Sequence, residues 1–141
     1  MSPRGYVLDA TVVSEVARGD LPLITMLFEL DERGLQLVVP ALVVSAVAAE
    51  IGGGDEATYL PAVRGIARLE HGAYGPLVGF DDALELGHTA AAMGDKRLRE
   101  DAHTALLARQ EGAVILTLDA GRWSELELDG VQVAEIADPE E

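Results

Sequence analysis

Apolar residues in this chain fall into short unbroken runs, separated by longer segments in which they recur every three or four positions. A short unbroken run bounded by turn residues is typical of a strand that is buried on both faces. The runs are 5–9 (GYVLD), 35–39 (LQLVV), 113–119 (AVILTLD) and, near the end of the chain, 131–136 (VQVAEI). The pattern therefore predicts a buried sheet.

The longer segments carry the end signals of helices. One helix is expected to begin near Thr11, and a second to run from its acidic cap Asp20 to Gly34. Pro40 suits the first position of a third helix. Three more are expected in 55–72, bent or delayed by Pro61, in 81–94, with Asp81 as its cap, and in 100–112. Strands that alternate with helices indicate an α/β fold, a three-layer α/β/α sandwich with a mainly parallel central sheet.

Composition narrows the class of protein. Residues 1–137 of the 141 are expected to form one domain, followed by a frayed acidic tail at 138–141. The chain has no cysteine and no apolar run near the roughly 20 residues that cross a bilayer, so we expect a soluble, cytoplasmic protein without membrane contact. The net charge of -15 argues against a sequence-reading DNA binder. Contact with nucleic acid then requires a local basic patch, a metal ion or a basic partner.

Three aspartates stand where a parallel sheet gathers functional groups. Asp9 and Asp119 end two of the apolar runs, and Asp101 opens a helix. Each one alone is explained as a helix cap or as a charge at the positive end of a helix dipole. If the three converge, their mutual repulsion requires a cation, and Mg²⁺ or Mn²⁺ prefers such oxygen ligands. The reaction predicted for such a site is hydrolysis of a phosphodiester by activated water.

Four motifs occur in a fixed order: YVLDATVV (6–13), VVPALVV (38–44), EDAHTALLA (100–108) and VILTLDAGRW (114–123). Together they resemble the PIN domain, and in particular the VapC-like toxins of bacterial type II toxin-antitoxin pairs. The resemblance spans nearly the whole chain. It implies a PIN-like fold and a metal-dependent endoribonuclease with Mg²⁺ or Mn²⁺ as cofactor. It also implies a homodimer, an RNA substrate and a cognate antitoxin that occupies the active-site groove.

The resemblance assigns roles to particular residues. Asp9, Asp101 and Asp119 match the acidic, metal-binding positions of the family. Thr117 matches a hydroxyl that usually supports them. Thr11, two residues after the first aspartate, is part of the pattern that carries the resemblance and is a second candidate supporting residue.

The fourth acidic position departs from the family pattern. A glutamate normally follows the proline of the VVPALVV motif by six residues, and here that residue is Ala46. Glu50 lies one turn further along nearly the same helix face, so it is the candidate fourth catalytic acid, acting directly or through water. Otherwise Glu50 is the solvated end of a buried helix, and three acids with reduced activity remain. Glu15 is another candidate helper, or simply a polar residue of the first helix.

Basic residues gather around the predicted site. Lys96, Arg97 and Arg99 precede the second aspartate and Arg122 follows the third, so four of the ten basic residues flank it. They are candidates to position RNA phosphates, although a solvated charged loop explains them equally well. Trp123 could stack on a base, but a lone tryptophan beside an apolar strand is more often packed.

Other functions have less support. The histidines, which are His71, His88 and His103, lack the spacing of a helical zinc site. No G-x-S-x-G motif is present, and the glycines at 52–54 lack the lysine and hydroxyl of a P-loop. Two alternatives remain. One is a weakened or non-catalytic PIN-like module that binds a basic protein, and the other is an α/β domain that binds a small molecule at the strand ends.

Overall fold

The computed structural model describes residues 4–51, 56–94, 99–124, 126, 128 and 130–136. In these ranges five parallel strands form one sheet in the order β3-β2-β1-β4-β5. The strands are β1 (Gly5–Leu8), β2 (Gln36–Pro40), β3 (Gly72–Gly75), β4 (Val114–Thr117) and β5 (Val133–Glu135). The helices are α1 (Ala10–Ala17), α2 (Leu21–Glu32), α3 (Ala41–Ile51), α4 (Glu56–Ala67), α5 (Gly79–Met93), α6 (Arg99–Glu111) and the 3-10 helix η1 (Ala120–Arg122).

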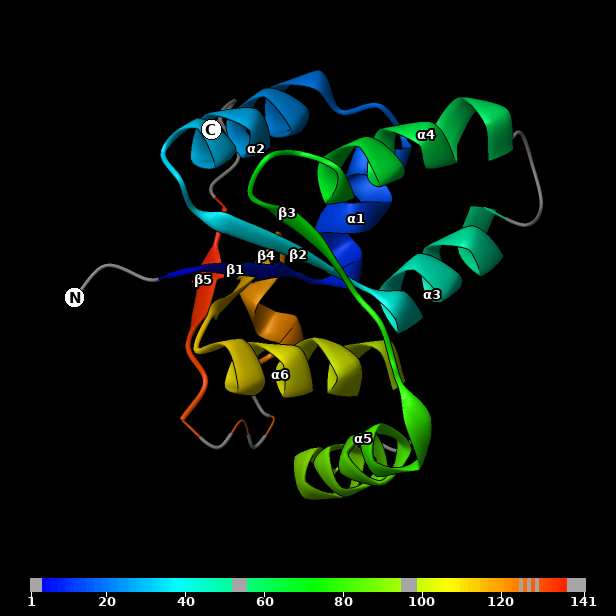
Figure 1. Ribbon diagram of the computed structural model, residues 1–141, viewed down its shortest axis with the longest axis vertical. Helices are drawn as coiled ribbons and strands as arrows, with labels where there is room; N and C mark the ends of the chain where they lie inside the picture. The colour runs from blue at the N-terminus through cyan, green and yellow to red at the C-terminus, as the bar shows by residue number, and fades with distance from the viewer. Residues whose placement is uncertain are drawn as a thin grey trace.

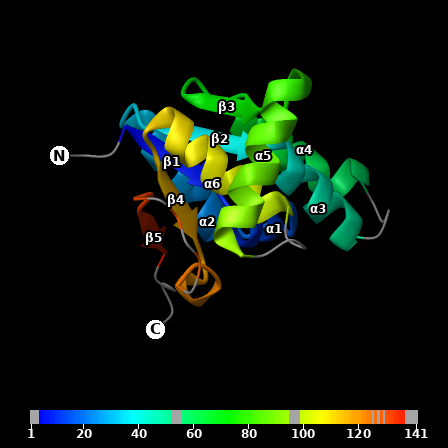
Figure 2. The same ribbon diagram turned by 90° about the horizontal axis from the view of Figure 1, so that it is seen from below.

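Helices cover both faces of the sheet (Figure 1). Successive strand residues point to opposite faces and so enter two separate apolar cores. Leu8, Leu37 and Leu116 pack with residues of α1, α2, α3 and α4. Their neighbours Val7, Val38 and Ile115 pack with residues of α5 and α6, which cover the face seen in Figure 2. The unbroken apolar runs of the sequence therefore serve two cores at once.

The structure confirms the predicted α/β fold, with a parallel sheet between two layers of helices. It also confirms Asp20 as the cap of α2, because the Asp20 side chain accepts the N–H of Leu23 at 3.1 Å. Pro61 lies inside α4. The tail predicted at 138–141 lies outside the described residues.

Three expectations differ from the structure. Pro40 ends β2, where it pairs with Gly75, and α3 starts one residue later. Asp81 lies in the first turn of α5 and is not its cap, because the helix starts earlier, after Val78. The carboxylate of Asp82 instead accepts the N–H of Val78 at 2.7 Å. The third difference is β3 (GAYG), a strand that was not predicted because it contains no apolar run.

The carboxyl ends of β1 and β4 lie side by side in the middle of the sheet. Leu8 pairs with Leu116, and the N–H of Asp9 donates to the carbonyl of Leu116 at 3.1 Å. The residues that follow each strand, Asp9 on one side and Thr117 to Asp119 on the other, therefore meet at one edge. No helix within the described ranges is long and apolar enough to span a membrane.

Candidate functional site

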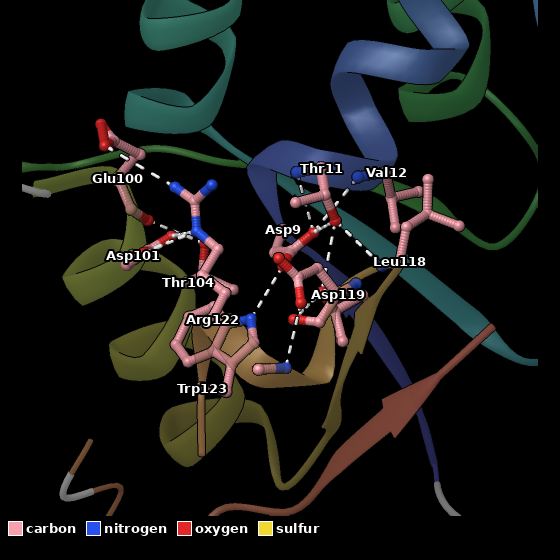
Figure 3. Close-up of polar contacts among 12 residues, drawn as sticks. Asp9, Thr11, Val12, Glu100, Asp101, Thr104, Leu118, Asp119, Arg122 and Trp123 are labelled. Carbon is pink, nitrogen blue, oxygen red and sulfur yellow. Dashed lines mark hydrogen bonds and ion pairs between the residues drawn. The ribbon is translucent and has the colours of Figure 1, made fainter. Parts of the chain in front are cut away.

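Asp9 is fully buried between β1 and α1, and both of its carboxylate oxygens accept hydrogen bonds (Figure 3). As the N-cap of α1 it receives, at Oδ1, the N–H groups of Thr11 and Val12 at 3.0 and 3.2 Å. The Thr11 hydroxyl donates to the same oxygen at 2.6 Å. Oδ2 accepts the indole Nε1–H of Trp123 at 2.8 Å. A buried carboxylate with this many donors is held in one orientation.

Two threonine hydroxyls join the ends of β1 and β4. The Thr11 hydroxyl lies 3.2 Å from that of Thr117 and accepts the N–H of Leu118 at 2.9 Å. Thr117 is fully buried, and its hydroxyl accepts the N–H of Asp119 at 3.0 Å. The two residues that were predicted to support the aspartates thus tie Asp9 and Asp119 to a common scaffold.

Asp101 lies in the first turn of α6 with 1% of its surface exposed. Arg122 Nε donates to both of its oxygens, at 3.0 and 2.8 Å. Burial raises the pKa of the Asp101 carboxyl above its ordinary value, and this outweighs the hydrogen bond and charge of Arg122, which lower it. The charges of Asp9 and Glu100 raise the Asp101 pKa further, so these three carboxyl groups interact electrostatically.

The guanidinium of Arg122 is the cation among these acids. Burial lowers the pKa of Arg122, but the hydrogen bonds and charge of Asp101, together with the charges of Asp9 and Glu100, raise it above its ordinary value. Glu100 Oε1 lies 4.0 Å from Arg122 Nη2. Figure 3 shows Arg122 with the labelled residues of α6 on one side and Asp9 and the labelled residues of α1 on the other.

Asp119 follows β4 and is exposed. Its Oδ1 accepts the N–H of Gly121 at 3.0 Å, which caps η1. The carboxylate keeps a second oxygen for other ligands. The η1 turn that Asp119 begins carries Arg122 toward Asp101 and is followed by Trp123, which reaches Asp9.

An open pocket of about 470 Å³ lies beside these residues. Its walls come from α1, α3, the start of α6 and the turn after β4, and they include Thr11, Glu15, Ala46, Glu50, Glu100 and Arg122. Ala46, where the family resemblance leads one to expect an acid, thus lies on the pocket wall. Three glutamates on that wall make the pocket acidic.

Glu50 also lies on the pocket wall but is tied to α1. Arg18 Nη2 lies 2.5 Å from Glu50 Oε1, and the Ser14 hydroxyl donates to both Glu50 oxygens at 3.3 Å. The side chains of Arg18 and Glu50 are about half exposed, at 53% and 49%. Glu50 therefore takes part in an ion pair at the rim of the pocket.

Of the residues predicted to contact RNA, those that the structure describes differ in their exposure and in their position relative to the pocket. Lys96 and Arg97 lie outside the described residues. Arg99 is exposed at the first position of α6. Arg122, whose side chain is 26% exposed, faces the pocket while it holds Asp101. Trp123 is 2% exposed and belongs to the core, so it is packed as expected of a lone tryptophan beside an apolar strand.

The donor groups of the site suit a hard divalent ion. Asp9, Asp101 and Asp119 offer carboxylate oxygens, which Mg²⁺ and Mn²⁺ prefer. Two of these carboxylates, Asp9 and Asp101, are buried, and the positive charge of Arg122 interacts with both. Among the described side chains, no group of three or more His, Cys, Asp and Glu residues is already arranged to hold a metal ion. The carboxylates fit the ion chemically, but Asp101 has Arg122 as its present partner.

Sequence reasoning missed two contacts in this site. It placed Arg122 and Trp123 near the aspartates but did not pair Arg122 with Asp101 or Trp123 with Asp9. It also assigned no role in the site to Glu100, which lines the pocket near Arg122. The sequence places the Arg-Trp pair three residues after Asp119, but it does not indicate which acids this pair contacts.

No protein-family model matches the chain, and no curated protein matches it. Solved structures do match. VapBC2 from Rickettsia felis, bound to a DNA fragment from its promoter, aligns with a TM-score of 0.68 and 10% identity over 94% of this chain and 98% of that chain. FitAcB from Neisseria gonorrhoeae aligns with a TM-score of 0.58 and 21% identity over 91% and 95% of the two chains.

A third structure, PAE2754 from Pyrobaculum aerophilum, aligns with a TM-score of 0.54 and 19% identity over 92% of this chain and 83% of that one. All three are PIN-domain proteins of toxin-antitoxin systems. At identities of 10% to 21% these matches establish the fold. The chain has the PIN fold that its motifs predict.

Proposed function

We propose that the protein is a Mg²⁺- or Mn²⁺-dependent endoribonuclease and the toxin of a type II toxin-antitoxin pair. Asp9, Asp101 and Asp119 are its proposed metal ligands. The observation that carries the proposal is the burial of Asp9 and Asp101 around one cationic position at the carboxyl edge of adjacent parallel strands. Burial of two acids costs stability, and such an arrangement is common at functional sites.

Each residue of the site has a definite part in this function. Asp9 is oriented by Thr11, Val12 and Trp123, and Asp119 is held by Thr117 and its own turn. When bound, a divalent ion supplies a Lewis acid that offsets the charge developing on the reacting phosphate. The pocket beside the acids, about 470 Å³ in volume, is open to an extended substrate. Arg99 and Arg122 are the described basic residues proposed to contact RNA phosphates.

The proposal is tested by RNA cleavage with purified protein that has been freed of any bound partner. We expect cleavage that needs added Mg²⁺ or Mn²⁺, stops with chelator and is abolished in Asp9→Asn. Asp81→Asn is the matched control, because Asp81 is exposed in the first turn of α5 and does not line the pocket. Cleavage that persists in Asp9→Asn at the level of the Asp81→Asn control would refute the assignment.

A protein partner is part of the proposal. The structural neighbours are toxin-antitoxin proteins, so we propose a cognate antitoxin for this chain as well. The walls of the pocket carry Glu15, Glu50 and Glu100, which suit a basic segment of such a partner. A homodimer remains part of the proposal from the family resemblance.

The acidic pocket also favours the second candidate function, a binding module without catalysis. In that case Ala46 marks the loss of a catalytic acid, and the ion pair of Arg122 with Asp101 is permanent. The RNA cleavage assay separates the two functions, because the binding module cleaves no RNA with either metal ion.

A further inference from the structure

Arg122 already supplies positive charge to the acids of the candidate site. Its Nε donates to both oxygens of Asp101, at 3.0 and 2.8 Å, and its Nη2 lies 4.0 Å from Glu100. Asp101 is 1% exposed, so its carboxylate is shielded from bulk solvent. Arg122 is the cation with which the buried Asp101 is compensated.

A divalent ion and this guanidinium cannot both bind the carboxylate oxygens of Asp101 at the same time. Mg²⁺ requires carboxylate oxygens at about 2.0–2.1 Å in near-octahedral geometry. Both oxygens of Asp101 already face Arg122 Nε, and two cations so close repel each other. Binding of the ion and the present position of Arg122 therefore oppose each other.

The two partners of the ion pair differ in their freedom to move. Asp101 is enclosed, whereas the Arg122 side chain is 26% exposed and forms part of the pocket wall. Glu100 lies on the same wall with 17% of its side chain exposed. The guanidinium can leave Asp101 toward Glu100 without losing a carboxylate partner.

We propose that Arg122 is an internal competitor for the divalent ion at Asp101, and that ion binding moves the guanidinium to Glu100 at the pocket wall. Arg122 is then a positioning residue whose side chain has two positions. In the first it neutralises the buried acid, and in the second it points its charge into the pocket. This inference rests on the proposed function, because the competing ion is the one proposed there.

The most direct test follows the Arg122 Nε–H by nuclear magnetic resonance in the unsubstituted protein. The signal is assigned by its absence in Arg122→Lys, and Mg²⁺ is diamagnetic and leaves it visible. We expect the metal-free signal to be protected from exchange with water, and saturating Mg²⁺ to shift it and speed its exchange. A signal that Mg²⁺ leaves unchanged overturns the proposal.

A second test compares the affinities of variants for Mn²⁺ by calorimetry, on proteins whose fold is checked by circular dichroism. Arg122→Gln is expected to bind Mn²⁺ about tenfold more tightly than the unsubstituted protein, because close charge pairs are coupled by this much or more. Arg33→Gln removes the same charge from an exposed position at the end of α2 and is expected to change nothing. Equal or weaker binding by Arg122→Gln, or no binding by any variant, overturns the proposal.

Glu100→Gln tests where the guanidinium goes. In the unsubstituted background this change is expected to weaken Mn²⁺ binding, because Arg122 loses the carboxylate that receives it. In the Arg122→Gln background it is expected to have no effect. Equal weakening in both backgrounds means that Glu100 binds the ion itself, and it overturns the movement to Glu100.

Failure of this inference and failure of the proposed function give different results. If Mg²⁺ stimulates RNA cleavage but Arg122→Gln does not bind Mn²⁺ more tightly, the function stands and the competition is refuted. If Arg122→Gln binds more tightly and RNA is not cleaved, the competition stands and the ribonuclease is refuted.

Discussion

The indole of Trp123 donates its Nε1–H to Oδ2 of Asp9 at 2.8 Å and so joins two residues that are 114 positions apart in the sequence. Both side chains are buried, with 2% of Trp123 and none of Asp9 exposed. The other oxygen of Asp9 caps α1. The contact fixes the turn after β4 to the end of β1 and leaves Asp9 in one orientation.

Trp123→Phe is expected to destabilise the protein by more than the loss of packing alone. Removal of a hydrogen bond to a buried charged group costs about 2 kcal/mol. Unfolding in urea of Trp123→Phe, Asp9→Asn and the double variant separates this energy from the packing loss. We expect a coupling energy above about 1 kcal/mol. Additive effects of the two substitutions would contradict a specific bond between these side chains.

The two partners of the Arg122–Asp101 pair are expected to respond unequally to substitution. Arg122→Gln leaves a buried carboxylate without its cation and should cost about 3 kcal/mol of unfolding free energy. Asp101→Asn leaves a partly exposed guanidinium that can turn to Glu100 or to water, so the cost should be about 1 kcal/mol. Urea unfolding of both variants measures the difference. A larger cost for Asp101→Asn would contradict this account of the pair.

Glu50→Gln is expected to have small effects. Glu50 and Arg18 form an exposed pair, which contributes less than about 1 kcal/mol to stability. The carboxylate of Glu50 is engaged by Arg18 and Ser14. Its charge is also exposed and therefore screened by salt. We thus expect the affinity for Mn²⁺ to change by less than about twofold in Glu50→Gln. A calorimetric titration measures this affinity. A loss of tenfold or more would identify Glu50 as the replacement for the acid expected at Ala46.

His103 is expected to make the protein less stable in mild acid. Its Nδ1 accepts the N–H of Leu42 at 3.3 Å, and the ring is 1% exposed. Burial lowers the pKa of His103 below 6.5, although the charge of Asp82 and the carbonyl of Pro76 raise it in part. The unfolded chain then binds more protons than the folded one as the pH falls through 6.5 toward the lowered pKa, so stability is lost over that window.

The His103 contribution is measured as a difference between two proteins. The excess stability of the unsubstituted protein over His103→Gln should shrink as the pH falls below 6.5. His88→Gln, at an exposed position of α5, is the control for the loss of a solvent-exposed histidine. A difference that does not change with pH for His103→Gln would contradict the buried neutral ring.

Most of the fold is predictable because its central strands serve two cores. Residues such as Val7 and Leu8 enter opposite cores, and this produces the unbroken apolar runs of the sequence. Strand β3 is not predictable from an apolar run, because its glycines are needed where other parts of the chain lie close to its backbone. A Cβ on Gly75 would lie 2.5 Å from Leu107, and one on Gly72 would clash with the carbonyl of Ile66.

The candidate site is predictable only in part, because some of its contacts depend on how distant segments pack together. The strand-end positions of Asp9 and Asp119 follow from local sequence, since an apolar run stops at each. The contacts of Arg122 with Asp101 and of Trp123 with Asp9 depend on how η1 is placed against α6 and β1. No local pattern encodes that placement, and the pairing is visible only in three dimensions.

In the proposed function, three aspartates that are far apart in the sequence share a divalent ion. Calorimetric titration with Mg²⁺ of the unsubstituted protein and of Asp9→Asn, Asp101→Asn and Asp119→Asn tests it most directly. We expect one set of sites in the unsubstituted protein and a loss of affinity of about tenfold or more in each variant. Binding in all three variants with the affinity of the unsubstituted protein would contradict it.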